Sequence, residues 1–492
     1  MTMGSKDDEQ GGLFVTYKDV PRSGGHPFYE ALDGILRANH FDRFVERECE
    51  LFYSGRGRPS LAPGVYFRCL FIGYFEGIDS ERGIAWRVSD SLSLRTFLGL
   101  GLTKTPPDHS TLSRTRRRLD LAVHHRVFEW VLTVLAEASL VRGKTLGVDG
   151  TTLEANAALR TLVRRDNGQA YHDYLVEIAK AEGIEEPTRE DIARLDRQRP
   201  KKGCNKTWVN PYEPDAEVSK MKNGSTDMAH KVEHAVDMHA GAIVGVTLHG
   251  GTTHDTKSLD ATLEEAESNL SAVRDNLRAK AEAARDDDDE GGHDIETQPK
   301  LSVAERIEET VLDKGYHANK TLCGLDESGI RSYVAEPKRG RRNWKNKQTE
   351  KRVVYANRRR VKGRRGRQLM RKRGELVERP FAHMYETGGM RRTHLRRHDN
   401  IKKRLLVHAA GANLGLLMRK TFGVGTPRSL QGRLAAFLLL LAMLLAWVWA
   451  RLGDWVASIL LSAEQSGDLS RPAARTRRLP SPGLRGLCAT GC

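Results

Sequence analysis

The sequence predicts an α/β protein in which a mixed sheet with flanking helices follows an all-helical N-terminal domain. Two observations indicate this fold class. Between about residues 27 and 140, apolar side chains recur with the 3.6-residue period of helices and are interrupted by polar breaks. After residue 144, short apolar runs alternate with longer helical segments, which is typical of a sheet covered by helices. A chain of 492 residues has room for about three domains.

The N-terminal region is expected to fold into short helices. Ser80 and Asp108 are predicted N-caps, because their side-chain oxygens can accept hydrogen bonds from the free N–H groups of a first turn. Short helices joined by tight turns are typical of a DNA-binding helix-turn-helix, and equally of any small helical bundle. The periodicity predicts helices over residues 28–44, 63–76, 80–89 and 110–140. The last of these carries a run of arginines that could contact DNA: Arg114, Arg116, Arg117 and Arg118.

Five short apolar runs predict the strands of the sheet. The first ends in Asp149 and the fourth is followed by Asp313. If these two strands are neighbours, both carboxylates emerge at the same edge of the sheet. The second and third runs are joined by a short turn at 238–241, which predicts a hairpin. The runs cover residues 144–149, 230–237, 242–249, 310–312 and 331–335, and a surface helix is expected from about 256 to 285.

The positive charge of the chain is concentrated in one window. The formal charge is +16, but residues 338–373 alone carry +17, because 18 of their 36 side chains are Lys or Arg and only Glu350 is acidic. Such a block repels itself and is expected to stay extended or loosely helical until a partner neutralises it. Its length and the interleaved Trp344 and Tyr355 favour contact with a nucleic-acid backbone over a solvated surface run or a localisation signal. The expected contacts in this window are Lys338, Arg339, Arg341, Arg342, Arg358, Arg359 and Arg360.

A helix over residues 368–385 is predicted to follow the basic window, and another over 400–420. The first contains Glu375 and Glu378, either of which could join the two strand-end aspartates. Three carboxylates from separate elements could hold Mg²⁺, which prefers hard oxygen ligands and keeps several waters. From placement alone, a helix-capping or turn role is the commoner one for such an aspartate.

Two further features of the sequence are candidates for a functional role. Asp255 could be an additional or outer-shell carboxylate, or it could cap the helix that follows it. Four arginines between the two helices could clamp DNA phosphates: Arg391, Arg392, Arg396 and Arg397.

Several segments of the sequence resemble one protein family. The segments are GRPSLAPGVYFRCLFIGYFEGIDSERGIAWRVSDSLSLRTFLGL at 57–100, PDHSTLSRTRRRL at 107–119, GVDGTTLEANA at 147–157, PDAEVSKMKNG at 214–224, VLDKGYHANK at 311–320, and residues 374–420 from GELVERPF onward. In composition and order they resemble bacterial insertion-sequence transposases of the DDE class, from the branch with a helical N-terminal domain and a DKGY motif. The resemblance extends from about residue 20 to residue 428.

This resemblance implies an RNase H-like sheet with Asp149, Asp313 and Glu378 as catalytic, metal-binding carboxylates, with Glu375 as the alternative to Glu378. It implies two Mg²⁺ ions, for which Mn²⁺ may substitute. The implied reaction is cleavage of double-stranded DNA at terminal inverted repeats, followed by attack of the freed 3′-hydroxyl on target DNA. Related transposases often have an arginine and a lysine spaced around the glutamate; those places hold Gly374 and Tyr385 here, so the motif fits a variant branch.

The resemblance also suggests a domain organisation. A flexible N-terminus (1–26) and a helical DNA-binding domain (27–140) are expected to precede an RNase H-like catalytic domain (141–425), with an apolar helix and a basic tail after it (426–492). The insertions into the catalytic domain are predicted at 157–228, 256–305 and 338–373.

The apolar segment 434–450 has 17 uncharged residues, the lower limit for a membrane span. A buried helix, a dimer contact or a read-through extension is favoured over a span. The polar start of the chain lacks a secretory leader, so a cytoplasmic, nucleoid-associated protein is expected. We expect a homodimer or larger assembly on DNA, with no small-molecule substrate. The alternatives are a catalytically inactive relic and a DNA-binding regulator.

Overall fold

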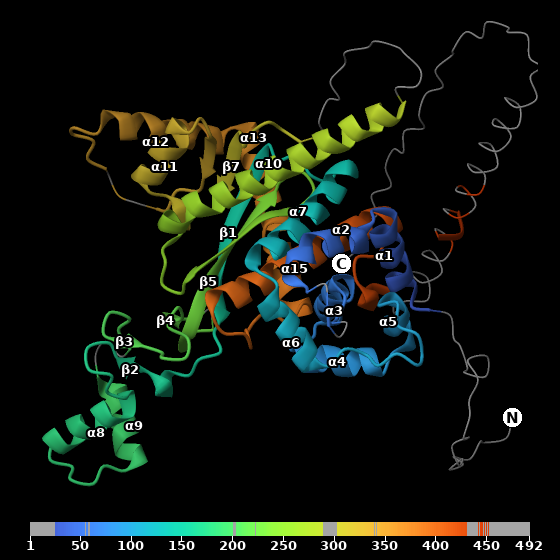
Figure 1. Cartoon of the computed structure of the whole chain (residues 1–492). Helices are drawn as coiled ribbons and strands as arrows, with labels where there is room; N and C mark the ends of the chain where they lie inside the picture. The colour runs from blue at the N-terminus through green and yellow to red at the C-terminus, as the bar shows by residue number, and fades with distance from the viewer. Residues whose placement is uncertain are drawn as a thin grey trace, which may run out of the picture. The chain divides into compact units, whose positions relative to one another are not determined.

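The computed structural model describes residues 25–430 except 55, 58–59, 200–202, 222, 289–302, 339 and 341, together with 441, 443–445, 447, 449 and 451. Residues 1–24 of the predicted flexible N-terminus and most of the apolar segment 434–450 lie outside these residues. The first of its two compact units, residues 1–439, contains every helix and strand discussed below. Figure 1 shows these elements along the chain.

The N-terminal region is helical, as predicted. Two of the four predicted helices are each split in two. The first breaks at His40, which has a left-handed backbone (φ 55°), and the last breaks before Asp120, whose side chain accepts from the N–H of Val123 at 2.8 Å. The predicted caps are confirmed, since Ser80 accepts from the N–H of Gly83 and Asp108 from the N–H of Ser110. The helices are α1 (Pro27–Ala38), α2 (Phe41–Cys49), α3 (Pro63–Glu76), α4 (Glu81–Ser89), α5 (Leu92–Phe97), α6 (His109–Arg118) and α7 (Leu121–Glu137).

The central sheet is mixed, which confirms the predicted α/β class. Its strands are β1 (Thr145–Glu154), β4 (Glu217–Lys220), β5 (Thr226–Asp237), β6 (Ile243–Gly250), β7 (Glu309–Leu312) and β8 (Arg331–Val334). β5 is antiparallel to β1, to β4 and to β6, whereas β1, β7 and β8 run parallel. The predicted hairpin is therefore the β5–β6 pair. β1 continues to Glu154 instead of ending at Asp149, because it keeps its pairing with β5 after its other neighbour, β7, has ended.

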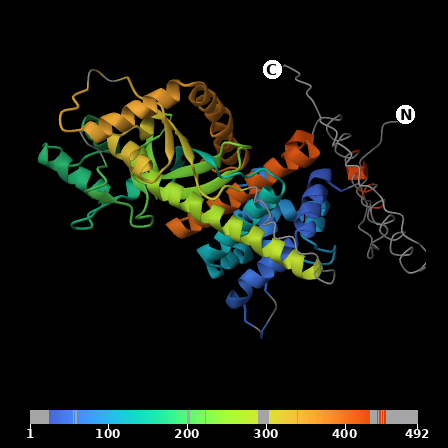
Figure 2. The same cartoon turned by 90° about the horizontal axis from the view of Figure 1, so that it is seen from above.

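Helices cover both faces of this sheet (Figure 2). On one face lies α10 (Asp255–Asp288), which contains the predicted surface helix and packs on β6, with Thr262 bonded to Thr247. On the other face lie the residues around Val377, which approach Gly147. α15 (His398–Phe422) packs against β6, α3 and α7, so the N-terminal helices share a core with this C-terminal helix. Arg404 on α15 donates hydrogen bonds to the carbonyls of Ile78 and Asp79, which reinforces this contact.

The segment between β1 and β5 forms small cores of its own. β2 (Val163–Arg164) pairs with β3 (Trp208–Val209), and helices α8 (Tyr171–Ala181) and α9 (Arg189–Gln198) follow in the same segment. The Trp208 ring lies edge-on to the rings of Tyr171 and Tyr174.

The basic window is helical over most of residues 348–373, so the extended alternative is wrong there and the helical alternative agrees with the structure. It contains α12 (Gln348–Lys362) and most of α13 (Arg364–Leu376), and α11 (Asn319–Glu327) packs against α12. The reason is that acidic groups on β7 and shortly after β8 neutralise some of the arginines. Arg358 pairs with Glu336 at 2.6 Å, and Arg365 pairs with the buried Glu309 at 2.5 Å. The single predicted helix over 368–385 is instead the end of α13, the short α14 (Glu378–Ala382) and a π-turn at His383–Thr387.

Among the residues that the structure describes, no helix is both long enough and apolar enough to cross a membrane.

Candidate active site

Asp149 and Asp313 follow the last paired residues of two neighbouring strands. The parallel register of β1 and β7 ends with Val148 opposite Leu312, so the two aspartates are the next residues on each chain. This register therefore brings the two carboxylates to the same edge of the sheet, as the sequence predicts. Asp313 also accepts from the N–H of Lys314 and so begins the short 3₁₀ turn Lys314–Tyr316. Asp313 therefore both caps this turn and lies at the edge of the sheet.

Glu378 reaches the same region because β1 has a glycine two residues before Asp149. Side chains alternate between faces along a strand, so Gly147 and Asp149 share a face. A Cβ at Gly147 would lie 2.5 Å from Cγ2 of Val377 and 2.8 Å from Sδ of Met238. The missing side chain thus lets the α13–α14 junction approach the strand, and it places Glu378 at the start of α14 beside Asp149. The Glu378 side chain is 64% exposed.

Arg373 connects two of the three carboxylates. Its Nη2 lies 2.9 Å from Oδ2 of Asp149, and its Nη1 lies 3.8 Å from Oε1 of Glu378. The arginine is 11% exposed and Asp149 is 24% exposed, so this pair is more shielded from water than a surface ion pair. The structure therefore joins Glu378 to Asp149. Glu375 instead lines a separate cavity of about 90 Å³ with residues of α15.

The three carboxylates offer hard oxygen donors of the kind that Mg²⁺ prefers. Within the described residues, however, no group of three or more His, Cys, Asp and Glu side chains is arranged to hold a metal ion. The positive charge next to Asp149 and Glu378 is supplied by Arg373. The carboxylate oxygens are thus suitable ligands for Mg²⁺. In this structure, however, Asp149 and Glu378 are held by Arg373 and are not arranged with Asp313 around a common metal position.

A buried polar network supports the turn after Asp313 from the opposite face. Glu233 on β5 is fully buried, and its Oε1 accepts from the hydroxyl of Tyr316 at 2.9 Å and from Ser258 at 2.6 Å. Burial, together with the charge of Glu233, holds the pKa of Tyr316 well above its usual value, so the phenol stays a donor. The tyrosine of the DKGY segment thus anchors the chain three residues after Asp313.

Lys231 extends this network to Asp255. Its Nζ lies 2.7 Å from Glu233 and 2.7 Å from Asp255. Asp255 lies against the backbone of Gly315, where a Cβ would collide with the carboxylate. Asp255 therefore contacts the turn that follows Asp313, and it also begins α10. Asp255 was a predicted candidate, whereas Lys231 and Glu233, two buried charged residues on β5, were not predicted.

The basic residues expected to contact DNA fall into two groups. Several point inward and have protein partners. Arg116 pairs with Glu81, Arg342 and Arg358 both pair with Glu336, and Arg360 donates to the carbonyl of Ser332. In the second group, Arg117 and Arg359 are exposed and make no side-chain ion pair or hydrogen bond among the described residues, and neither does Lys338. Arg339 and Arg341 lie outside the described residues.

The remaining candidates are exposed, and most of their side chains contact other residues of the protein. Arg114 donates to Ser110 within its own helix, and Arg118 donates to Ser60. Arg391 pairs with Glu386, and Arg392 lies 3.3 Å from Glu154. Arg396 donates to the carbonyl of Asn156, and the backbone N–H of Arg397 donates to the buried Glu213.

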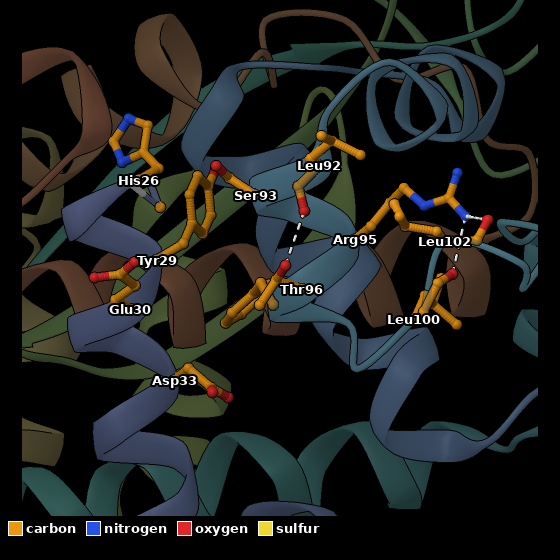
Figure 3. A pocket seen from close by; sticks show the side chains of 13 residues that line it. His26, Tyr29, Glu30, Asp33, Leu92, Ser93, Arg95, Thr96, Leu100 and Leu102 are labelled. Carbon is orange, nitrogen blue, oxygen red and sulfur yellow. Dashed lines mark hydrogen bonds between the residues drawn. The ribbon is translucent and has the colours of Figure 1, made fainter. Parts of the chain in front are cut away.

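A separate cavity of about 330 Å³ lies between α1 and α5 (Figure 3). Tyr29, Glu30 and Asp33 line one side, whereas Ser93 and Thr96 line the other. Nη2 of Arg95 donates to carbonyls of the loop that follows α5, including that of Leu102 at 2.8 Å, whereas the buried Nε of Arg95 has no hydrogen-bond partner among the described residues. None of the residues lining this cavity is a predicted site residue.

A search of curated proteins finds no match to this chain. Residues 22–118 match the family model described as a transposase domain (DUF772). The matched region contains α1 to α6 and the arginines of α6, and it supports the identification of this protein as a transposase.

Proposed function

We propose that this protein is a DDE-type DNA transposase that binds the terminal inverted repeats of its element, cuts at their ends and joins the freed 3′-hydroxyl to target DNA. The observation that supports the proposal is that Asp149 and Asp313 directly follow the last residues that pair two adjacent parallel strands, while Arg373 links Glu378 to Asp149. The strand order, with an antiparallel β6–β5–β1 group followed by parallel β7 and β8, supports an RNase H-like catalytic domain.

Asp149, Asp313 and Glu378 would hold two Mg²⁺ ions, for which Mn²⁺ can substitute. Bound there, the ions would activate a water and stabilise the leaving 3′ oxygen of a phosphodiester. Arg373 compensates the charges of Asp149 and Glu378, and it must release at least one of them to admit a divalent cation. The exposed cations of α12 and α13 would bind backbone phosphates of double-stranded DNA beside these carboxylates.

Cleavage of DNA carrying the element's terminal repeats tests the proposal. The purified full chain should nick this DNA in Mg²⁺ or Mn²⁺. Asp149→Asn and Asp313→Asn should abolish nicking while leaving DNA binding in a gel-shift assay unchanged. Glu378→Ala should behave likewise, and the matched variant Glu375→Ala should still cut. Undiminished cleavage by both aspartate variants would refute the assignment of the site.

The ion pairs of Arg373 favour a second candidate, a chain that binds DNA without cutting it, either as a regulator or as an inactive relic. In that case Arg373 is a permanent counter-ion of Asp149 and Glu378. The parent protein would then bind terminal-repeat DNA but would not cut it with either Mg²⁺ or Mn²⁺.

We also propose that the protein forms a homodimer or a larger assembly on DNA. The mass of the complex on DNA, measured in the same samples, tests this.

A further inference from the structure

A positively charged cavity of about 260 Å³ lies beyond the end of β1, away from the three carboxylates. It is lined by Arg160, Arg392 and Arg396, together with Tyr212 and Asn210. The other lining residues are Asn156, Ala157, Ala158 and Thr161, so no acidic side chain lines the cavity. Arg392 pairs with Glu154, which lies outside the lining, whereas Arg160 and Arg396 have no ion pair among the described residues, and this surplus of positive charge favours an anionic ligand.

The cavity also has an exposed aromatic side chain on a firmly held turn. Tyr212 is 61% exposed, and the guanidinium of Arg396 lies 5.6 Å from the centre of its ring. Asn210 is fully buried below it, and its side-chain oxygen accepts from the N–H groups of Tyr212 and Glu213. The Asn210 amide also donates to Thr161 at 2.8 Å. The turn is therefore fixed from below, while the tyrosine ring remains available above it.

Two walls of the cavity are fastened together. These two walls are the turn at 210–213 and the loop at 391–397, and the segment 156–161 after β1 forms a third wall. The buried carboxylate of Glu213 accepts from the backbone N–H of Arg397 at 2.8 Å. The loop also pairs with the end of β1, since Glu154 donates to the carbonyl of Arg391 and accepts from the N–H of Thr393. A site whose walls are held in this way needs little reorganisation to bind a ligand.

We propose that this cavity binds a single unpaired nucleotide of DNA, with its phosphate on the arginines and its base stacked on Tyr212. An aromatic ring beside arginines is the combination that holds unpaired bases, because every base has a π-face and every nucleotide a phosphate. In paired DNA the base faces are covered by their neighbours, so the ring of Tyr212 gives a preference for unpaired positions. The inference rests on the proposed function in taking DNA as the ligand.

The cavity lies too far from the three carboxylates to take part in cleavage. Asn156 lies seven residues after Asp149, and a strand rises about 3.3 Å per residue, so the cavity is about 20 Å from the carboxylates along β1. That distance is about six nucleotide steps of a DNA strand. Tyr212 is therefore a binding residue for DNA beside the cut and does not touch the reacting phosphate.

Binding of the full chain to two DNAs tests the inference, in buffer with EDTA so that no cutting occurs. One duplex carries a single extrahelical 2-aminopurine, and the matched duplex is fully paired. We expect the parent to bind the first about 10-fold more tightly and to quench its fluorescence. Tyr212→Ala should lose the preference, whereas Tyr212→Phe should keep it.

Two further variants complete the test. Trp86→Ala removes another exposed aromatic side chain, on α4, and should keep the parent's preference. Arg160→Ala removes an exposed cavity arginine that has no ion pair among the described residues, so it should weaken binding of both duplexes alike and lower the slope of log affinity against log salt by about 0.9. Equal binding of both duplexes by the parent, or an unchanged preference in Tyr212→Ala, would overturn the inference.

Cleavage in Mg²⁺ is measured separately with the same parent protein. A parent that cuts terminal-repeat DNA but shows no preference for the unpaired base overturns the nucleotide site alone. A parent that shows the preference but never cuts supports the site and overturns the proposed function.

Discussion

Gly147→Ala tests whether the glycine on β1 positions the third carboxylate. The added methyl would lie 2.5 Å from Cγ2 of Val377 and 2.8 Å from Sδ of Met238, whereas carbon atoms in contact are usually about 3.5 Å or more apart. The flexible Met238 side chain can turn away. Val377 is fully buried, branched and short, so it can give way only if its backbone moves by about 1 Å. Overpacking of this kind costs about 1–3 kcal/mol of unfolding free energy.

The same displacement should reduce cleavage, because Glu378 is the next residue after Val377. A misplacement of about 1 Å in a catalytic group costs about 100-fold in rate. Urea unfolding followed by intrinsic fluorescence measures the stability, and initial rates of DNA nicking measure the activity. Gel-shift affinity for the terminal-repeat DNA should stay within about twofold of the parent, because the atoms nearest the added methyl belong to Val377 and Met238 and not to an exposed arginine.

Two further variants sharpen this test. In Gly147→Ala/Val377→Ala, the clashing Cγ2 is absent, so the two changes should be non-additive by about 0.5–3 kcal/mol. Gly34→Ala is the matched control, since a Cβ there would meet no atom within 4 Å and Gly34 lies inside α1. It should raise stability by about 0.5–1 kcal/mol. A Gly147→Ala protein as stable and as active as the parent would refute the reasoning.

Three other changes are expected to have distinct effects. Tyr316→Phe removes a hydrogen bond to the buried Glu233 and should lower the unfolding free energy by about 1–3 kcal/mol in urea unfolding, with the rest of the network intact. Burial lowers the pKa of His230 to about 4, so the unfolded chain takes up a proton below about pH 6.5 while the folded chain does not. His230 should therefore contribute about 3 kcal/mol to the loss of stability between pH 6.5 and 4, and His230→Leu should reduce that loss in thermal melts, while the buried His124 and His234, whose pKa values burial also lowers, keep their own contributions. Arg367→Gln should weaken DNA binding and its salt dependence without affecting stability, whereas Arg365→Gln should lower the melting temperature, because Arg365 has a buried partner on β7.

The fold was predictable where local chemistry decides it. Apolar runs set the strands, and the polar oxygens of Ser80 and Asp108 set two helix starts. The common edge of Asp149 and Asp313 followed from assuming that their strands are neighbours, which the β1–β7 register confirms. The break at His40 was not predictable in this way, because a positive φ at a residue other than glycine is imposed by tertiary packing.

The role of Arg373 was missed because a basic window looks uniform in sequence. The sequence nevertheless contained a signal that Arg373 faces the sheet. Arg365, Leu369 and Arg373 are spaced four residues apart, so they share a face of α13. Leu369 is buried on this face, and both arginines reach carboxylates of the sheet. An arginine on the apolar stripe of a helix therefore predicts a buried acidic partner better than it predicts a DNA phosphate.

The two faces of α13 connect the charge of the window to the position of Glu378. Arg365 and Arg373 tie one face to Glu309 and Asp149, whereas Arg367 and Arg371 are exposed and have no ion pair among the described residues. The exposed cations repel one another, which opposes formation of the helix. DNA phosphates on the exposed face would remove that repulsion and stabilise α13. Because Glu378 follows α13 after one residue, DNA binding under the proposed function should also order the third carboxylate, and hydrogen exchange at 374–378 should slow when DNA is added without metal.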